Sequence, residues 1–305
     1  MTAHPARRET DPVNRSAPTG NRASTVLGRR LGGELLRLRD AAGKTQQQAA
    51  GVLDATNSKI VKMEQGLVPM RDIDIRALCE CYGLEDPKTL SRLLALAKLD
   101  RERRKTKGWW QHAPQARGIA EYIAMEDAAS EIRTWQQSLI PGLLQTPEYT
   151  RGVVVSAGLW QDPDEIEGVV DVRQKRQARL SGSNPLQFYA VIGEGVLRQQ
   201  VGGPEVMRAQ LRHLIEVAEL PNVRIQVLPF RSGGHACIGG SFNIVSFAEA
   251  EAVDVVHVDS IAATVWVENE ADSTTYSSFF DRTARLSLAP KDSLRLVEST
   301  CEDMH

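Results

Sequence analysis

The residues best suited to chemistry lie in one short stretch of the first third of the chain, where polar and basic side chains surround a single valine: Asn57, Ser58, Lys59, Val61 and Lys62. If this stretch is helical with Ile60 and Met63 turned inward, these five residues occupy its outward positions. They are rich in hydrogen-bond donors and include no acid, which suits contact with the acceptor-lined major groove of DNA. The chemistry indicated is therefore recognition rather than catalysis.

Two short helices joined by a tight turn would position these side chains. The first helix is predicted to begin at Thr45, because Thr45 and Gln48 fit the capping box, in which the two side chains satisfy free backbone N–H groups. Its apolar face is short and consists of Ala49, Val52 and Leu53. A turn interrupts the pattern, and a second helix follows that starts at Thr56 or Asn57 and ends before Gly66. Such a pair lays its second helix in the major groove of DNA.

The stretch of residues 45–66 resembles the helix-turn-helix of the Cro/C1, or Xre-type, repressors over its whole length. The shared features are the Thr-Gln start, the small residue Ala49, the apolar residues Ile60 and Met63, and the closing Glu64-Gln65-Gly66. That family often has glycine where this chain has Asp54, at a turn position that needs a positive φ, and aspartate tolerates this conformation better than most residues. The alternative is a plain helical hairpin with no role in DNA binding.

The resemblance implies a contact for each polar residue of the motif. Gln46, at the amino end of the first helix, and Thr56 would contact backbone phosphates of double-stranded DNA. Asn57 and Ser58, in the first turn of the second helix, would face base edges, and asparagine suits adenine through a bidentate contact. The lysines that follow would reach phosphate or, for the second of them, guanine: Lys59 and Lys62.

Five short helices around a leucine-rich core are predicted over residues 26–100. The first carries leucines at helical spacings (Leu27, Leu31, Leu35 and Leu38) and ends at Gly43. Asp72 is expected to cap the fourth helix, and Asp86 with Pro87 to open the fifth. The count and order of these helices match the Cro/C1 arrangement.

Composition places the chain among ordinary globular proteins. It has 305 residues and 33.6 kDa, room for two domains, with 42% hydrophobic and 25% charged residues. No apolar run approaches the roughly 18 to 20 residues of a membrane helix, and no apolar segment follows Arg7 and Arg8 as in a secretory signal. We expect a cytoplasmic protein whose cysteines are reduced thiols: Cys79, Cys81, Cys237 and Cys301.

Charge divides the chain. Residues 26–108 hold 17 Lys/Arg and 11 Asp/Glu, whereas residues 109–305 hold 16 Lys/Arg and 26 Asp/Glu. A basic first part favours contact with a polyanion, and an acidic remainder is repelled by it.

Residues 1–25 lack bulky apolar side chains and are predicted to be a disordered basic arm. Residues 101–118 form a basic linker in which Trp109 and Trp110 follow a run of charges; the tryptophans are expected to pack into the next domain, the alternative being that the run tracks phosphate.

The second half predicts an α+β domain over residues 119–300, with a mixed or antiparallel sheet. A helix is expected over 119–137, another after Thr146, and a third from Asp162 to Leu180. Short segments rich in β-branched residues predict strands at 186–192, 223–228, 241–247, 253–258 and 264–267, with a helix over 204–218 and a closing helix pair, 272–288 and 290–299. The chain as a whole is therefore predicted to be α+β.

The second half also resembles a known domain, a C-terminal domain of unknown function that follows an Xre-type helix-turn-helix in many actinobacterial regulators. The resemblance lies in Ile140–Thr146, Gly193–Arg198 with Val201-Gly202, Gln210-Leu211 with Leu214, and Val227-Leu228-Pro229. Those regulators are antitoxin-like and commonly sit beside a gene for a very small partner protein. The resemblance implies a regulator and no defined chemistry.

Patterns typical of catalytic or metal sites are weak. Gly193-Glu194-Gly195 follows an apolar strand but lacks the third glycine of a dinucleotide loop, so a turn and a helix-surface pair of Glu194 with Arg198 are favoured. His235 lies two residues from Cys237 on a glycine-rich loop without a neighbouring acid, and His257 is expected to be structural. The sequence thus predicts no catalytic residue, metal or cofactor.

The favoured function is a sequence-specific DNA-binding transcriptional regulator that reads an operator as a homodimer, gated by a ligand or a small protein partner bound to the acidic domain. The alternative is an antitoxin that binds a small protein encoded nearby and autoregulates its operon. A third hypothesis is an enzyme with a DNA-binding appendage, which would need His235, Glu194 or another acid to converge in one deep pocket.

Overall fold

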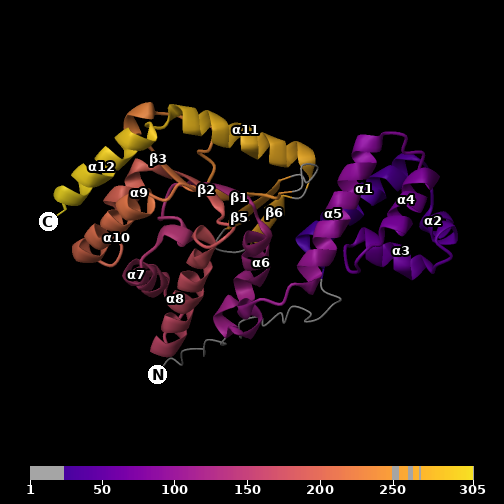
Figure 1. Cartoon of the computed structure of the whole chain (residues 1–305), viewed down its shortest axis with the longest axis horizontal. Helices are drawn as coiled ribbons and strands as arrows, with labels where there is room; N and C mark the ends of the chain where they lie inside the picture. The colour runs from indigo at the N-terminus through magenta and orange to yellow at the C-terminus, as the bar shows by residue number, and fades with distance from the viewer. Residues whose placement is uncertain (1–23, 249–253, 260–263, 268, 305) are drawn as a thin grey trace, which may run out of the picture.

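The computed structural model describes residues 24–248, 254–259, 264–267 and 269–304. The arm expected over residues 1–25 lies outside the described residues except for Ser24 and Thr25. A helical part and a larger α+β part lie side by side in Figure 1, joined through the end of α5. The fold is α+β overall, as the sequence predicts.

The N-terminal part is a bundle of helices: α1 (Val26–Ala41), α2 (Gln46–Val52), α3 (Asn57–Glu64), α4 (Asp72–Cys81) and α5 (Pro87–Lys105). The predicted leucines of α1 build its core, since Leu27, Leu31 and Leu35 are at most 1% exposed. Ile60 and Met63 of α3 and Ile75 and Leu78 of α4 meet them there. The helical spacing of the leucines therefore correctly predicts the face of α1 that is buried.

Two local expectations in this bundle are wrong. Val52 is 43% exposed rather than part of the core, because α2 ends at this residue and the chain already turns away toward Asp54. The cap of α4 is the backbone of Arg71, and Asp72 is the first helical residue. Asp72 and Asp74 both stand in the first turn of α4, where a carboxylate is favoured by the helix dipole.

The connection between the two parts is ordered by its tryptophans. After α5 the chain forms two 3₁₀ turns, η1 (Trp109–His112) and η2 (Pro114–Ile119). Trp110 is 4% exposed and packs with Ala116, Ile123, Ala124 and Val172. Trp110 therefore packs into the C-terminal part, as expected.

The C-terminal part is built on one mixed sheet. Its strands are β1 (Glu131–Gln136), β2 (Gln187–Gly193), β3 (Val223–Leu228), β4 (Phe242–Ser246), β5 (Val255–Asp259) and β6 (Thr264–Val267), in the order β3-β2-β1-β4-β5-β6. β1, β2 and β3 are parallel, and β4, β5 and β6 continue antiparallel from β1. Parallel neighbours require helical crossovers, which these strands have.

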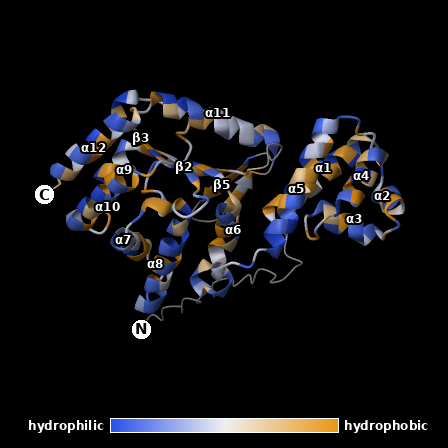
Figure 2. Ribbon diagram, in the orientation of Figure 1, coloured by the Kyte–Doolittle hydropathy of each residue, from blue (hydrophilic) through white to orange (hydrophobic). Residues whose placement is uncertain are grey.

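Helices cover both faces of this sheet. α11 (Glu270–Leu286) lies across one face, where Phe280 packs with Trp135 and Val191. The opposite face is covered by α7 (Pro147–Ala157), α10 (Pro204–Val217) and α12 (Pro290–Glu302), with α8 (Pro163–Gln177), α6 (Ala120–Ala128) and the short α9 (Glu194–Arg198) and turns η3 (Gly142–Leu144), η4 (Ala178–Leu180) and η5 (Phe230–Ser232) at its margins. Figure 2 shows these helices with hydrophobic and hydrophilic residues interleaved, as amphipathic helices require.

The helix expected over 119–137 is wrong in its second half. α6 ends at Ala128 and the chain enters β1, the centre of the sheet. Ile132 packs on one face of the sheet and Trp135 on the other, so the strand has no exposed face and no simple polar–apolar alternation. Their spacing of three also fits a helix, which explains the error. The other predicted strands are all present.

Candidate nucleic-acid interface

The recognition helix, the name used below for α3, is fixed by its cap and its inner face. Thr56 is its N-cap, and the Thr56 hydroxyl accepts a hydrogen bond from the backbone N–H of Lys59 at 3.3 Å. Ile60 and Met63, each 1% exposed, anchor the helix to the bundle. Because the two core residues are three apart, the residues between and before them are held on the outside.

Four of the predicted DNA-contacting residues are open to solvent. Asn57, Ser58 and Lys62 are exposed on the recognition helix, and the cap residue Thr56 is exposed beside them. No described hydrogen bond or ion pair occupies the side chains of Asn57, Ser58 and Lys62 within the part of the chain the structure covers. Their donors and acceptors are thus available to a partner. Contact with base edges remains a prediction for these residues.

Lys59 has a different environment. Its ammonium lies 3.5 Å from the carboxylate of Asp74, which also accepts two hydrogen bonds from Arg71. Burial alone would raise the pKa of Asp74, but the hydrogen bond from Arg71 and the charge of Lys59 outweigh it and lower that pKa. The outward face of the recognition helix therefore carries no acid of its own, but Asp74 of α4 lies beside it. If Lys59 contacts a DNA phosphate, its ammonium must serve that phosphate and Asp74 at the same time.

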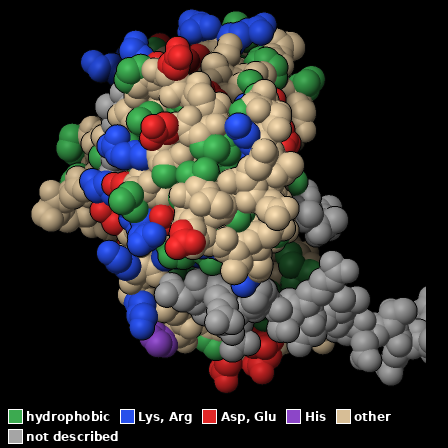
Figure 3. Space-filling model, turned by 90° about the vertical axis from the view of Figure 1, so that its right-hand side faces the viewer, with side chains coloured by type: hydrophobic (Ala, Val, Ile, Leu, Met, Phe, Trp, Pro, Cys, Tyr) green, Lys and Arg blue, Asp and Glu red, His purple; other side chains and the backbone are tan. Residues whose placement is uncertain are grey.

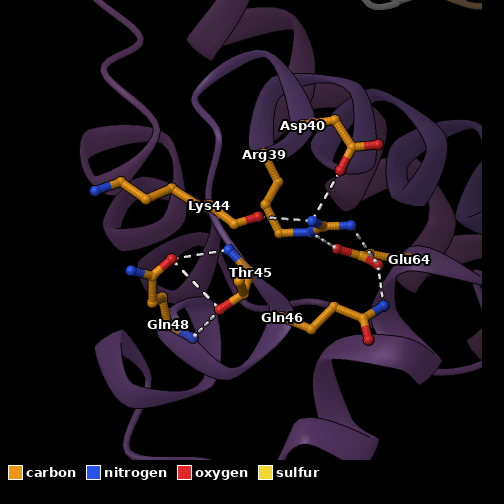
Figure 4. Close-up of polar contacts among 7 residues, drawn as sticks. All are labelled: Arg39, Asp40, Lys44, Thr45, Gln46, Gln48 and Glu64. Carbon is orange, nitrogen blue, oxygen red and sulfur yellow. Dashed lines mark hydrogen bonds and ion pairs between the residues drawn. The ribbon is translucent and has the colours of Figure 1, made fainter.

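Gln46 lies in an internal network that ties α1, α2 and the recognition helix together. The guanidinium of Arg39 donates to Glu64 at 2.6 Å and to the carbonyl oxygen of Lys44 at 2.8 Å. Gln46 donates its amide N–H to the second carboxylate oxygen of Glu64 at 2.7 Å. Figure 4 shows these side chains converging on Glu64, beside the Thr45–Gln48 capping box, which is confirmed. Glu64 is thus the acceptor that fixes the angle between α2 and the recognition helix.

The turns around the motif require particular backbone conformations. Asp54 has φ +46°, as the sequence predicts for this position. Gly66 has φ +66°, and a Cβ there would lie 2.2 Å from the backbone nitrogen of Arg29. A side chain at Gly66 would therefore push the end of the recognition helix away from α1.

Basic side chains surround this end of the molecule. Figure 3, which looks onto the helix-turn-helix end, shows Lys and Arg side chains along one margin with acidic side chains between them. Arg71, the N-cap of α4, and Arg76 on α4 are exposed. The basic run at the end of α5 is different, since Arg101 contacts the carbonyl of Met70 and Asp72, and Arg104 pairs with Asp100. The arginines of this run are therefore used inside the protein, whereas Lys105 and Lys107 are exposed.

The other candidate residues do not converge on a catalytic site. Glu194 accepts hydrogen bonds from Arg198, as expected, and from the backbone of Phe230. His235 meets Trp135 edge to face with ring centroids 4.9 Å apart, while His257 is buried against Tyr122 and Trp266. The described residues contain no group of His, Cys, Asp and Glu arranged for a metal. Among them, no helix has the length and apolarity needed to span a bilayer.

Comparison with known families agrees with this geometry. A family model described as a helix-turn-helix domain matches residues 30–93, which include the recognition helix and its supporting network, and this match supports a DNA-binding regulator rather than an enzyme. A second family model, described as a domain of unknown function (DUF5753), matches residues 119–299. That match covers more than half of the chain, and the protein belongs to this family. Curated proteins and solved structures give no match.

Sequence reasoning missed the groups that hold the recognition helix in place. Arg39 and Asp74, 8% and 6% exposed, act on this helix from α1 and α4, through Glu64 and Lys59. Arg104 was visible only as one cation in a basic run. The one available signal was the closing Glu-x-Gly of the motif, because a glutamate at the end of an otherwise acid-free helix needs a cationic partner when it is buried.

Proposed function

We propose that the protein is a sequence-specific transcriptional regulator of the Xre, or Cro/C1, type. The recognition helix enters the major groove of an operator, where Asn57 and Ser58 read base edges and Lys62 reaches guanine or phosphate. Thr56, Gln46 and Lys59 contact the backbone. A homodimer reads two half-sites, because one such domain covers only one of them.

One observation carries this proposal. The recognition helix presents Asn57, Ser58 and Lys62 to solvent without intramolecular partners among the described residues, while its other side is locked by Ile60, Met63 and Glu64. A surface of free donors on a rigid helix is what direct readout of base edges requires. A helical hairpin with no ligand gains nothing from such an arrangement.

Selection of duplexes from a random DNA pool tests the proposal. The full-length protein is expected to enrich a short motif with two-fold symmetry, and the double variant Asn57→Ala/Ser58→Ala to lose about 2–6 kcal/mol at that motif. Ser183→Ala/Asn184→Ala is the matched control, since this exposed pair of the same residue types lies in the turn before β2. Equal enrichment by the wild-type protein and the Asn57/Ser58 variant would exclude the assigned recognition helix.

The C-terminal domain is proposed to supply dimerisation and gating by a ligand or a small protein partner. The exposed Phe230, at 66%, lines a cavity of about 550 Å³ with Leu288 and Leu296, and this hollow supports binding of a ligand or of a partner's side chain. The antitoxin alternative predicts a toxic small protein encoded beside this gene. Co-expression that abolishes toxicity even with Asn57→Ala/Ser58→Ala would favour it, because neutralisation then needs no DNA.

A further inference from the structure

The junction between the two parts of the protein contains a buried network of hydrogen bonds that ends at the recognition helix. Asp100 and Arg104, one turn apart on α5, form an ion pair of 2.8 Å with side chains 1% and 5% exposed. Arg104 also donates to the carbonyl oxygen of Gly66, which follows the recognition helix, at 2.7 Å. A guanidinium can make both contacts at once because its donors are spread over a planar fork.

The first turn of α1 belongs to the same network. The hydroxyl of Thr25, the N-cap of α1, donates to Asp100 and accepts from Arg104. The backbone of α1 then meets the end of the recognition helix directly, since the Cβ position of Gly28 lies 2.9 Å from the carbonyl oxygen of Gly66. With no side chain between them, a shift of either backbone must move the other.

The C-terminal domain holds this same turn from the opposite side. Glu121, in the first turn of α6, accepts a hydrogen bond from the backbone N–H of Val26 at 3.1 Å. Its second oxygen pairs with Arg103 at 2.5 Å. One carboxylate of the C-terminal domain thus fastens both α1 and α5. The route to the recognition helix runs from Glu121 to the backbone of Val26, along the chain to its neighbour Thr25, and through Asp100 and Arg104 to Gly66.

We propose that Arg104, paired with Asp100, is a positioning residue for DNA recognition, and that Glu121 couples it to the C-terminal domain. Arg104 touches no DNA, because its side chain is buried. It fixes the angle of the recognition helix relative to the rest of the bundle. A shift of α6 moves α1 through the Glu121–Val26 contact, and the shift of α1 changes that angle. This inference rests on the proposed function and adds to it the route by which the C-terminal domain acts on DNA binding.

Operator preference is the readout that separates positioning from simple stability. Arg104→Gln is expected to lower the ratio of operator to non-specific affinity about tenfold, because base contacts depend on helix angle, while non-specific affinity changes less than about twofold. Arg104→Lys should lower this ratio to a similar extent although it keeps the positive charge, since an ammonium cannot replace the planar fork of the guanidinium. Lys105→Gln, an exposed neighbour, is the control for a lost cation. A parallel loss of both affinities, or an unchanged ratio in both Arg104 variants, would overturn the proposal.

A double-mutant cycle tests the link to the C-terminal domain. Glu121→Ala and Arg104→Lys do not remove a shared contact, so independent effects on operator affinity would multiply. Coupling through α1 predicts a deviation from that product of about threefold or more, and Glu121→Gln, which keeps an acceptor for Val26, should retain most of the coupling. Simple multiplication of the two effects would remove Glu121 from the proposal.

Amide hydrogen exchange without DNA makes the result independent of the operator. Arg104→Lys and Glu121→Ala should each speed exchange at Gln65–Leu67, and Lys105→Gln should not. Unchanged exchange in both variants would refute the network. If the wild-type protein selects no DNA motif at all, the proposed function fails, and the exchange result still decides whether these residues restrain the recognition helix.

Discussion

At the scale of single residues, the helix-turn-helix depends on one buried carboxylate. Glu64 and Arg39 have side chains 7% and 10% exposed and are 2.6 Å apart. Glu64→Ala would leave the buried guanidinium with only the exposed Asp40 as an ionic partner and is expected to lower the free energy of unfolding by about 3 kcal/mol. Urea unfolding measures this loss, with Glu80→Ala on the exposed side of α4 as the control. Equal losses in the two variants would show that Arg39 finds water or another acceptor.

Histidine 257 makes stability depend on pH. Burial lowers the pKa of His257 to about 4, and its neutral ring is bonded at Nδ1 by Asn243. The unfolded chain binds this proton with a pKa near 6.5, so stability is intact above that value and falls as the pH drops toward 4. The loss between pH 7 and pH 5 is expected to be about 2 kcal/mol. In His257→Gln, the free energy of unfolding measured in urea should change by about 2 kcal/mol less between pH 7 and pH 5 than in the wild-type protein. An equal change in the two proteins would contradict a lowered pKa for His257.

At the scale of elements, the sequence predicts what local contacts decide. Caps and core spacings at Thr45, Thr56, Ile60 and Met63 are local, and the helices around them were predicted correctly. β1 was not, because its stability comes from two neighbouring strands and from a salt bridge of Arg133 with Asp254, which no local pattern reveals. Likewise, the exposed side of the recognition helix was predictable, but its supports, Arg39, Asp74 and Arg104, come from other helices.

The turn before the recognition helix contains strain that can be relieved. Asp54 is the one described non-glycine residue with positive φ, and this left-handed conformation costs an L-residue roughly 1 kcal/mol. Asp54→Gly should therefore raise the free energy of unfolding by about 0.5–1 kcal/mol, whereas Asp54→Ala should lower it, since aspartate tolerates the left-handed conformation better than alanine. Thermal unfolding of the three proteins gives the order. A less stable glycine variant would mean that the Asp54 side chain outweighs its backbone strain.

At the scale of the whole molecule, the basic and acidic halves are joined by contacts that link their motions. Besides Glu121, Arg30 of α1 donates to the carbonyl oxygen of Asp254 at 2.8 Å. Arg92 of α5 makes a two-point pair with Glu270, the first residue of α11. The contacts are spread along the α1–α5 pair, from Val26 and Arg103, which meet Glu121, to Arg30 and Arg92, so the bundle is held at two places rather than hinged at one.

The outer of these contacts is open to a direct test by charge reversal. Arg92 and Glu270 are 2.7 Å apart with side chains 30% and 44% exposed, so the pair contributes at most about 1 kcal/mol to global stability. Its expected effect is local: Glu270→Arg places two cations together and should speed amide exchange in the first turn of α11. Adding Arg92→Glu should restore protection in part, because arginine at a helix N-terminus opposes the dipole by about 0.5 kcal/mol.

A matched reversal inside one domain separates this effect from a general response to charge. Asp292→Arg breaks the exposed pair of Asp292 with Arg295 in the first turn of α12, which joins no second domain. It should alter exchange in α12 alone, whereas Glu270→Arg should also speed exchange at the start of α5, where Arg92 is anchored. If Glu270→Arg leaves α5 unchanged, the two-place attachment is wrong and the bundle is held only through Glu121, the contact nearest the recognition helix.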